Sequence, residues 1–269
     1  MEINRSNIFE IVNIAGAKPD KDYGQTFLVE PLICERIVNA LNVDGNDTII
    51  EVGPGLGSLT HFLSLKQCDV TAVDIDRRMV DFLNVIYKDS NVNIVENDIR
   101  KTDVSNFTKV VGNLPYNITT ETIQYFLINA RKANRMVFMI QSETFAHFYD
   151  VEGKEYGPTS VLIHLLGNIE KLFVVKAGSF YPVPKCSSTV FAINIYTRVN
   201  CLAAISAFKV AKQLFINRRK TILNNLVNYL KNKDLATKLL DDLHINPLSR
   251  PEELKPEIYL AISEYLNNK

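Results

Sequence analysis

The sequence predicts an α/β fold followed by a small domain that contains helices only. In the first two thirds of the chain, apolar runs of strand length alternate with amphipathic stretches of helical periodicity. Such alternation is typical of βαβ units, which build a parallel sheet with helices on both faces. After Thr197 the periodicity is helical to the end. We therefore expect a sheet domain over residues 1–198 and an α-helical domain over residues 199–269.

Seven runs are expected to form one Rossmann-like sheet, and the last alternates enough to be antiparallel. They are Thr48–Val52, Val70–Val73, Val92–Val95, Lys109–Val111, Met136–Ile140, Leu172–Val175 and Val190–Ile195. The helices expected between and after them are Leu59–Leu65, Met79–Tyr87, Thr122–Ala130, Leu202–Ile216, Thr221–Leu230, Leu235–Leu243 and a last helix that Pro251 opens at its first turn.

Composition narrows the class of protein. The 269 residues are 46% hydrophobic and 22% charged, which is typical of a globular chain. No stretch approaches the roughly 20 apolar residues of a membrane span, and residues 1–20 are too polar for a signal peptide. We expect a cytoplasmic protein without a metal, since neither the cysteines nor the histidines have ligand spacing. These residues are Cys34, Cys68, Cys186, Cys201, His61, His147, His164 and His244.

A glycine-rich segment, Glu51–Thr60, follows the first strand directly. Glycines there allow a sharp turn and a close approach of the backbone to a ligand. The dinucleotide fingerprint would require a third glycine at position 58, which is Ser58. The observed E-x-G-x-G-x-G spacing is instead associated with S-adenosylmethionine, whose nucleoside carries no phosphate. Gly53 and Gly55 are therefore candidate cofactor contacts.

Acidic residues at the ends of the next two strands strengthen this interpretation. Asp74 and Asp76 end the second strand, where a carboxylate can accept hydrogen bonds from ribose hydroxyls. Asp98 follows the third strand and could accept one from the adenine amine of the cofactor. A single acid of this kind is more often a solvated loop residue, but their order at successive strand ends favours a binding site.

The segment Asn113-Leu114-Pro115-Tyr116 follows the fourth strand, at the sheet edge where α/β enzymes place their chemistry. Asn113 offers a side-chain carbonyl, Leu114 favours extended geometry before a proline, and Tyr116 offers a π-face. The exocyclic amine of a base needs such acceptors, because its lone pair is delocalised into the ring. Taken alone, the segment also fits a proline-terminated turn.

With these motifs the chain resembles the KsgA-type family of ribosomal RNA small-subunit adenine dimethyltransferases over nearly its whole length. Four further segments resemble motifs of this family. Gly24–Leu28 is similar to its G-Q-N-F-L motif, and Tyr156–Val161 is similar to its Y-G-x-L-S-V motif. Phe180–Lys185 is similar to F-x-P-P-P-K, and Leu214–Thr221 is similar to a segment that contains F-x-Q-R-R-K. Thr26 replaces the usual Asn and Asp74 the usual Glu, and both keep the hydrogen-bonding sense. Glu121 stands where a proline often follows the Asn113 loop, and its charge suits a helix start.

The resemblance implies roles for individual residues. The segment with Gln25 lies over the methionine end of the cofactor, and Phe180 packs on the target adenine opposite Tyr116. Without the family, Phe180 would be a core aromatic before a proline turn. The expected cofactor contacts are Gln25, Thr26, Leu28, Gly53, Gly55, Asp74, Asp98 and Asn113, and the expected catalytic residues are Asn113, Leu114, Pro115, Tyr116 and Phe180.

Charge is distributed unevenly although the net charge is zero. Residues 201–269 hold 11 Lys and Arg against 7 Asp and Glu, so residues 1–200 carry the compensating negative charge. The C-terminal part contains a basic triplet, Arg218-Arg219-Lys220. Such a triplet is usually a solvated helix end. By the resemblance it contacts rRNA phosphates, onto which arginine can fork.

The resemblance implies N6-dimethylation of two adjacent adenosines near the 3′ end of small-subunit rRNA, in a hairpin of an immature particle. The expected protein is a monomer that binds S-adenosylmethionine and the small-subunit rRNA. A macrolide-resistance enzyme acting on large-subunit rRNA and a non-catalytic assembly factor are the alternatives. A mitochondrial transcription-factor relative is disfavoured, since residues 1–20 contain only Arg5 as arginine, and a nicotinamide dehydrogenase lacks its third glycine.

Overall fold

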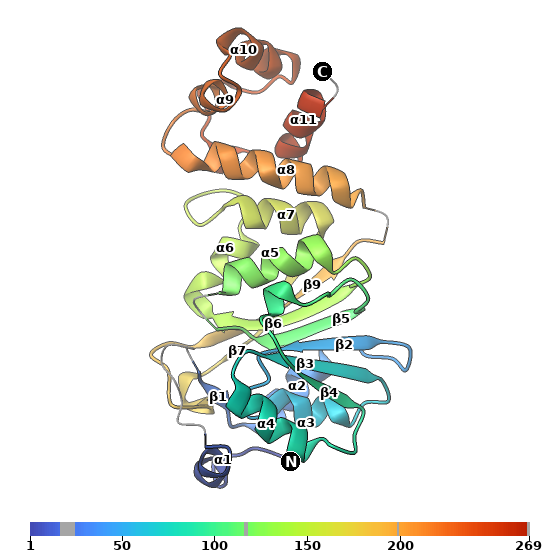
Figure 1. Cartoon of the computed structure of the whole chain (residues 1–269). Coiled ribbons are helices and arrows are strands. Elements are labelled where there is room, and N and C mark those ends of the chain that lie inside the picture. Colours follow the sequence, from blue (N-terminus) through green and yellow to red (C-terminus); the bar gives the residue numbers. More distant parts are fainter. Residues whose placement is uncertain (17–24, 116–117, 198, 268–269) are drawn as a thin grey trace. The chain divides into compact units, whose positions relative to one another are not determined.

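The computed structural model of the chain describes residues 1–16, 25–115, 118–197 and 199–267 (Figure 1). The chain forms two compact units. The sheet unit consists of Met1–Glu143 and Glu170–Ile195, and the helical unit of Thr144–Ile169 and Tyr196–Lys269. The α/β class and the helical C-terminal part are therefore as the sequence predicts.

Seven strands form the main sheet, in the order β4-β3-β2-β5-β6-β9-β7. The pairs from β4 to β6 are parallel, and β9 runs antiparallel to β6. All seven predicted strands are present, and so is the predicted antiparallel one. Their bounds are β2 Thr48–Val52, β3 Asp69–Asp74, β4 Val92–Glu96, β5 Lys109–Asn113, β6 Arg135–Gln141, β7 Gly167–Val175 and β9 Ser188–Ile195.

The helices of the sheet unit cover both faces of this sheet. Because crossovers between parallel strands are right-handed, α3 and α4 lie on one face and α5 on the other (Figure 1). The central strands are accordingly continuous apolar runs, and Val110, Val111 and Val137 are fully buried. The helices of this unit are α1 Ile8–Ile14, α2 Pro31–Asn39, α3 Ser58–Ser64, α4 Arg77–Ile86 and α5 Thr119–Asn129.

A second, two-stranded sheet joins β1 (Phe27–Leu28) to β8 (Phe180–Tyr181) in antiparallel register. Neither segment is predicted as a strand from the sequence. Each strand has only two residues, too few for a period-2 pattern, and they lie about 150 residues apart in the chain. Only the closed fold brings them together.

The helical unit has its own core, centred on Tyr156, Val161, Leu214 and Tyr259. The predicted boundary after residue 198 differs from the structural division, because residues 144–169 group with the C-terminal helices: α7 packs against α8 and α11. The helices of this unit are α6 Ala146–Tyr149, α7 Pro158–Leu166, α8 Cys201–Leu214, α9 Ile222–Leu230, α10 Lys233–Asp242 and α11 Pro256–Asn267.

The start of the last helix corrects the prediction. Pro251 opens a single 3₁₀ turn, Pro251–Glu253, and α11 begins at Pro256. A helix that began at Pro251 would place Pro256 in its interior, where the missing N–H and the ring clash cost about 3 kcal/mol. The second proline therefore sets the helix start, since a first-turn proline loses no hydrogen bond.

Candidate functional site

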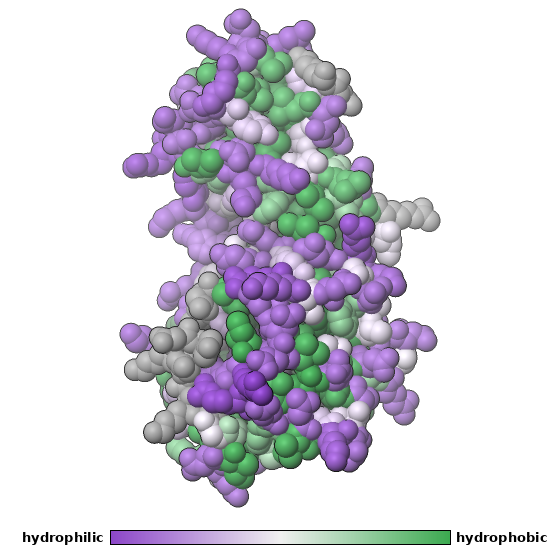
Figure 2. Space-filling view, viewed as in Figure 1, coloured by the Kyte–Doolittle hydropathy of each residue, from purple (hydrophilic) through white to green (hydrophobic). Residues whose placement is uncertain are grey.

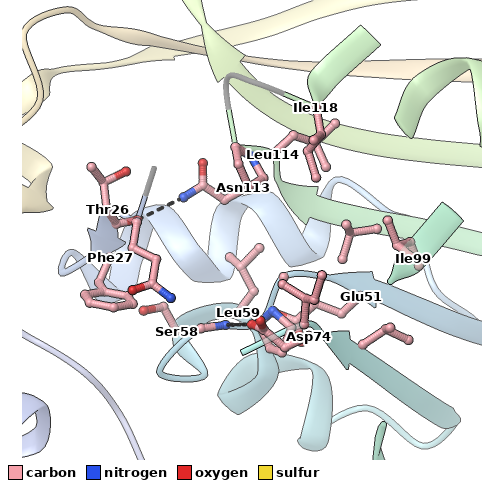
Figure 3. Close-up of a pocket in the computed structure, with 18 of the residues that line it drawn as sticks. Thr26, Phe27, Glu51, Ser58, Leu59, Asp74, Ile99, Asn113, Leu114 and Ile118 are labelled. Atoms are coloured by element: carbon pink, nitrogen blue, oxygen red, sulfur yellow. Dashed lines mark hydrogen bonds between the residues drawn. The ribbon is translucent and has the colours of Figure 1, made fainter. Parts of the chain in front are cut away.

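A pocket of about 310 Å³ opens at the carboxyl ends of β2, β3, β4 and β5 (Figure 3). The strand register places Val52 level with Val73 on one side and Gly112 on the other. The residues that follow these strands therefore meet at one edge of the sheet. The strand order reverses at β2, and open α/β sheets bind ligands at such a switch point.

The glycine loop forms one wall of the pocket. Gly53, Gly55 and Gly57 have φ angles of 61°, 56° and 93°, a region that side chains rarely tolerate. A Cβ atom on Gly55 would lie 3.1 Å from the ring of Phe27, so this ring packs directly on the loop. Gly53 and Gly55 both line the pocket, as the sequence predicts for cofactor contacts.

Asp74 lines the pocket and also holds the glycine loop in place. Its Oδ2 accepts a hydrogen bond from the backbone N–H of Gly55 at 3.0 Å, and its Oδ1 accepts one from that of Asp76 at 2.9 Å. The side chain is 8% exposed, and this burial raises its pKa. A carboxylate has about four acceptor positions, so Asp74 keeps acceptors for a ligand hydroxyl.

Asp98 reaches the same pocket from the end of β4. Its Oδ2 lies 2.8 Å from Nη2 of Arg100, and hydrogen bonding to this guanidinium lowers the pKa of Asp98. Arg100 is the only Lys or Arg among the described residues that line the pocket, against the carboxylates of Glu51, Asp74 and Asp98. The pocket therefore offers no unpaired Lys or Arg to a phosphate among these residues, which suits a nucleoside without phosphate.

Glu51 is a pocket residue for which the sequence predicted no role. It is 1% exposed, and its Oε2 accepts a hydrogen bond from the Thr60 hydroxyl at 2.7 Å. Burial raises the pKa of Glu51 to about 8, so the side chain is largely neutral at pH 7 without a ligand. Glu51 is the first residue of the E-x-G-x-G-x-G segment, and this position could have identified it as a pocket residue from the sequence. The side chain offers a latent negative charge inside the pocket.

The Asn113 loop forms the opposite wall. The Asn113 side-chain amide donates to the backbone carbonyl of Thr26 at 3.2 Å (Figure 3), which leaves its oxygen as an acceptor. The N–H of Leu114 donates to the carbonyl of Met139 at 3.0 Å, so β6 supports this loop. Leu114 and Pro115 line the pocket together with Asn113.

The aromatic pair expected to hold the target base is only partly described. Tyr116 lies outside the described residues. Phe180 pairs with Leu28 in the small sheet, is 3% exposed and belongs to the core of the sheet unit, and it is not among the residues that line the pocket. Gln25, Thr26 and Leu28 do line it. The structure thus brings the described residues expected to bind the cofactor together, but Phe180 lies beside β1 and does not line the pocket.

The basic triplet occupies a turn between α8 and α9 of the helical unit. Nη2 of Arg218 donates to the carbonyl of Gly153 at 3.2 Å, and its Nε lies 3.6 Å from Oε2 of Glu252. Arg219 and Lys220 are exposed. Figure 2 shows hydrophilic side chains over much of this unit's visible face. Arg218 is therefore engaged within the fold, whereas its two neighbours reach solvent.

Asn225 determines the shape of this basic turn. The side chain is 2% exposed, and its amide nitrogen lies 3.2, 3.2 and 3.1 Å from the carbonyl oxygens of Asn217, Lys220 and Thr221. A buried amide that satisfies several carbonyls holds a turn in one conformation. The basic residues are therefore presented from a preorganised backbone.

Neither a metal centre nor a membrane span is found within the described ranges. No group of three or more potential metal ligands occurs there. No helix among them is both long and apolar enough to cross a membrane.

The fold and the pocket define the class of protein: a Rossmann-like methyltransferase whose cofactor is S-adenosylmethionine. The glycine loop, the acids at successive strand ends and the lack of an unpaired Lys or Arg among the described lining residues fit this cofactor. The chain belongs to the ribosomal RNA adenine dimethylase family, which matches residues 16–268. It is therefore an rRNA adenine methyltransferase, and the family resemblance drawn from the sequence is confirmed.

Individual relatives agree with this membership. The chain is 34% identical over 253 residues to ribosomal RNA small subunit methyltransferase A of Acidithiobacillus ferrooxidans, covering 91% of this chain and 93% of that protein. It is 32% identical to the protein of the same name from Streptococcus pneumoniae, with 93% and 92% covered.

Solved structures show the same fold. A dimethyladenosine transferase from Plasmodium falciparum superposes with a TM-score of 0.75 at 22% identity, covering 90% of this chain and 98% of that one. The 23S rRNA methyltransferase ErmE superposes with a TM-score of 0.68 at 21% identity, with 90% and 99% covered. At these identities the likeness concerns the fold alone.

Proposed function

We propose that this protein transfers methyl groups from S-adenosylmethionine to N6 of two adjacent adenosines near the 3′ end of small-subunit rRNA, twice on each. The observation that carries the proposal is the Asn113 side chain, whose amide nitrogen is held by Thr26 at the pocket wall while its oxygen remains an acceptor. The curated relatives above 30% identity, which are small-subunit methyltransferases by name, support the choice of subunit.

In this proposal the sheet edge holds the cofactor by its two ends. Asp74 accepts from the ribose hydroxyls and Asp98 from the adenine amine, while Gln25, Thr26 and Leu28 contact the methionine end. Glu51 provides a carboxyl group that can ionise beside a cationic ligand. The bound cofactor supplies an electrophilic methyl group, and the protein supplies orientation and a shaped pocket.

The target amine is oriented by acceptors. The Asn113 side-chain oxygen and the Leu114 carbonyl accept its N–H groups, and this directs its lone pair out of the ring plane. Tyr116 and Phe180 hold the splayed base by stacking. Because Phe180 is 3% exposed, its contact with a base requires its side chain to become accessible. The proton lost from nitrogen after transfer passes to solvent, so no strong general base is needed.

The helical unit is proposed to recognise the ribosomal particle. Arg219 and Lys220 are exposed on a turn that Asn225 shapes, and each can contact an rRNA phosphate. The proposed setting is an immature small subunit in the cytoplasm, with the protein acting as a monomer.

The decisive experiment is methyl transfer from radiolabelled cofactor to unmethylated small subunits, to large subunits and to protein-free rRNA. We expect label only in small-subunit rRNA, in two adjacent dimethylated adenosines. Label in large-subunit rRNA would favour a macrolide-resistance activity. Tight binding to small subunits without transfer would favour an assembly factor.

A further inference from the structure

Three aromatic residues, Phe27, Tyr181 and Phe9, lie between the glycine loop and an exposed part of the sheet unit. Phe27 packs on Gly55, as shown by the 3.1 Å approach of its ring to the position of a Cβ atom there. Tyr181 stands directly opposite Phe27 in the β1–β8 ladder. Directly opposed residues project from the same face of an antiparallel pair, so Phe27 and Tyr181 lie on one face of the small sheet. Phe9 then packs edge-to-face on Tyr181, with ring centroids 4.9 Å apart.

The outermost ring is exposed although its helix is well anchored. Ile8, Ile11 and Val12 of α1 are buried in the core of the sheet unit. Phe9 projects from the other side of the helix and is 62% exposed, and Val183, two residues after Tyr181, is 67% exposed. The fold therefore does not need Phe9 to fill its core. The exposed ring is held in place by a helix whose opposite side is fixed.

The segment that leads into α1 is tied to the same region. Arg5 donates from Nη2 to the carbonyl of Gly178 at 3.0 Å, just before β8, and from Nε to Glu30 at 2.7 Å. These bonds connect residues 173 and 25 positions apart. The aromatic pair is thus preorganised, which lowers the entropy cost of binding a flat ligand.

We infer that Phe9 and Tyr181 form a stacking subsite for an unpaired nucleobase, that of the nucleotide next to the adenosine being methylated. The inference rests on the proposed function, in which the target adenosine has an unpaired neighbour. When the target base enters the pocket, the base of the adjacent nucleotide must lie outside the pocket, near its opening. Phe27 lines that pocket, Tyr181 is paired with Phe27 in the small sheet, and Phe9 packs on Tyr181. An aromatic face accepts any base, since every base has a π-face.

Crosslinking tests the location of the base. The photoreactive residue p-benzoylphenylalanine is installed at position 9 of the full chain, which is then irradiated on unmethylated small subunits, and rRNA crosslinks are mapped by primer extension. We expect crosslinks at the two target adenosines or at the nucleotides immediately next to them. The control is the same residue at position 85, because Val85 is 77% exposed on a different helix, α4. Crosslinks to distant rRNA or to a ribosomal protein would overturn the inference.

Kinetics give a second, independent test. Phe9→Ala and Tyr181→Leu should each raise the KM for small subunits about 5- to 150-fold, the range for a base stacked on an aromatic side chain. Tyr181→Phe should restore the wild-type value, and cofactor affinity should stay unchanged in all variants. Val85→Ala should leave both quantities unchanged. Wild-type KM values in Phe9→Ala and Tyr181→Leu would overturn the subsite while leaving the proposed function intact, whereas absence of transfer by the wild type would refute that function itself.

Discussion

The side-chain amide of Asn113 donates a hydrogen bond to the backbone carbonyl of Thr26, across 87 positions of sequence, at 3.2 Å. This bond ties the loop after β5 to the segment that enters β1, and both segments line the pocket. It also determines which end of the amide is available. With nitrogen engaged by a carbonyl, the oxygen is the atom that can accept from a substrate amine.

Asn113→Ala should therefore reduce methyl transfer far more than binding. Loss of the oriented acceptor removes an interaction used in the transition state, so kcat should fall at least about 100-fold while affinity for small subunits stays near wild type. Some loss of cofactor affinity is expected, since the variant also releases Thr26. Single-turnover transfer at saturating cofactor measures the effect, and turnover within a factor of three of wild type would exclude the proposed role.

Asp74 and Asp98 should differ in what their removal does. Each is expected to lose a charge-assisted hydrogen bond to the cofactor, worth roughly 1.5 to 3 kcal/mol, which is about tenfold or more in affinity. Asp74→Ala should also lower the free energy of unfolding, because the N–H groups of Gly55 and Asp76 lose their acceptor. Asp98→Ala should have a smaller effect on stability, since its ion pair with Arg100 lies near the surface.

Calorimetric titration with cofactor and urea unfolding of the same samples separate these two effects. Unchanged cofactor affinity in both variants would place the nucleoside elsewhere.

Glu51 should make the stability of the cofactor-free protein depend on pH. Its folded-state pKa of about 8 lies above its ordinary value of 4.5, so between these pH values the folded state binds a proton that the unfolded state has lost. Stability contributed by this group is complete below about pH 4.5 and declines as pH rises to about 8, by roughly 1 kcal/mol per pH unit.

Glu51→Gln should remove this decline, because the amide does not titrate. Urea unfolding at pH 6, 7 and 8, compared between wild type and variant, measures the difference. As pH rises, the free energy of unfolding of the wild type should fall relative to that of Glu51→Gln. A gap that is independent of pH would mean that Glu51 is ionised in the folded protein throughout this range.

The three basic residues of the turn should not be equivalent. Arg219→Ala combined with Lys220→Ala should flatten the dependence of log affinity for small subunits on log salt by about 1.4 to 1.8, the value for two rRNA phosphate contacts. Arg218→Ala should leave the slope near wild type and instead lower the free energy of unfolding by about 1 kcal/mol, because Gly153 loses its donor.

Salt titrations of subunit binding, with thermal unfolding as the control for the fold, decide this prediction. Equal slopes for the double variant and the wild type would show that the turn is only a solvated helix end. A reduced slope for Arg218→Ala would show that this side chain leaves Gly153 to bind phosphate.

Gly57 offers a test of the glycine loop itself. Its φ is 93°, and a Cβ atom added there would lie 2.8 Å from Cδ2 of Leu83, so any side chain is unfavourable. Gly57→Ala should lower the free energy of unfolding by about 1 to 3 kcal/mol. Gly45 is the matched control, because its nearest neighbour would lie at 3.7 Å and its φ is ordinary, so Gly45→Ala should be near neutral. Equal effects in both variants, measured by urea unfolding, would contradict this account of the loop.

Much of the molecule was determined locally and could be predicted from the sequence. Strands such as β2 and β6 are apolar runs bounded by turns and loops, and a sheet covered on both faces requires that composition. The glycine loop and the acids Asp74 and Asp98 all line the pocket, because parallel strands in register bring their carboxyl ends to one edge. The family follows from the same motifs.

Tertiary structure decided the features that depend on segments distant in sequence. The ladder of β1 and β8, the burial of Phe180 and the assignment of residues 144–169 to the helical unit have no local pattern that could reveal them. The pKa of Glu51 depends on how completely the folded protein removes water from it. Likewise, only the hydrogen bond from Arg218 to the carbonyl of Gly153 distinguishes the role of Arg218 from that of Arg219 and Lys220. The sequence shows three similar charges and does not show which of them bonds within the fold.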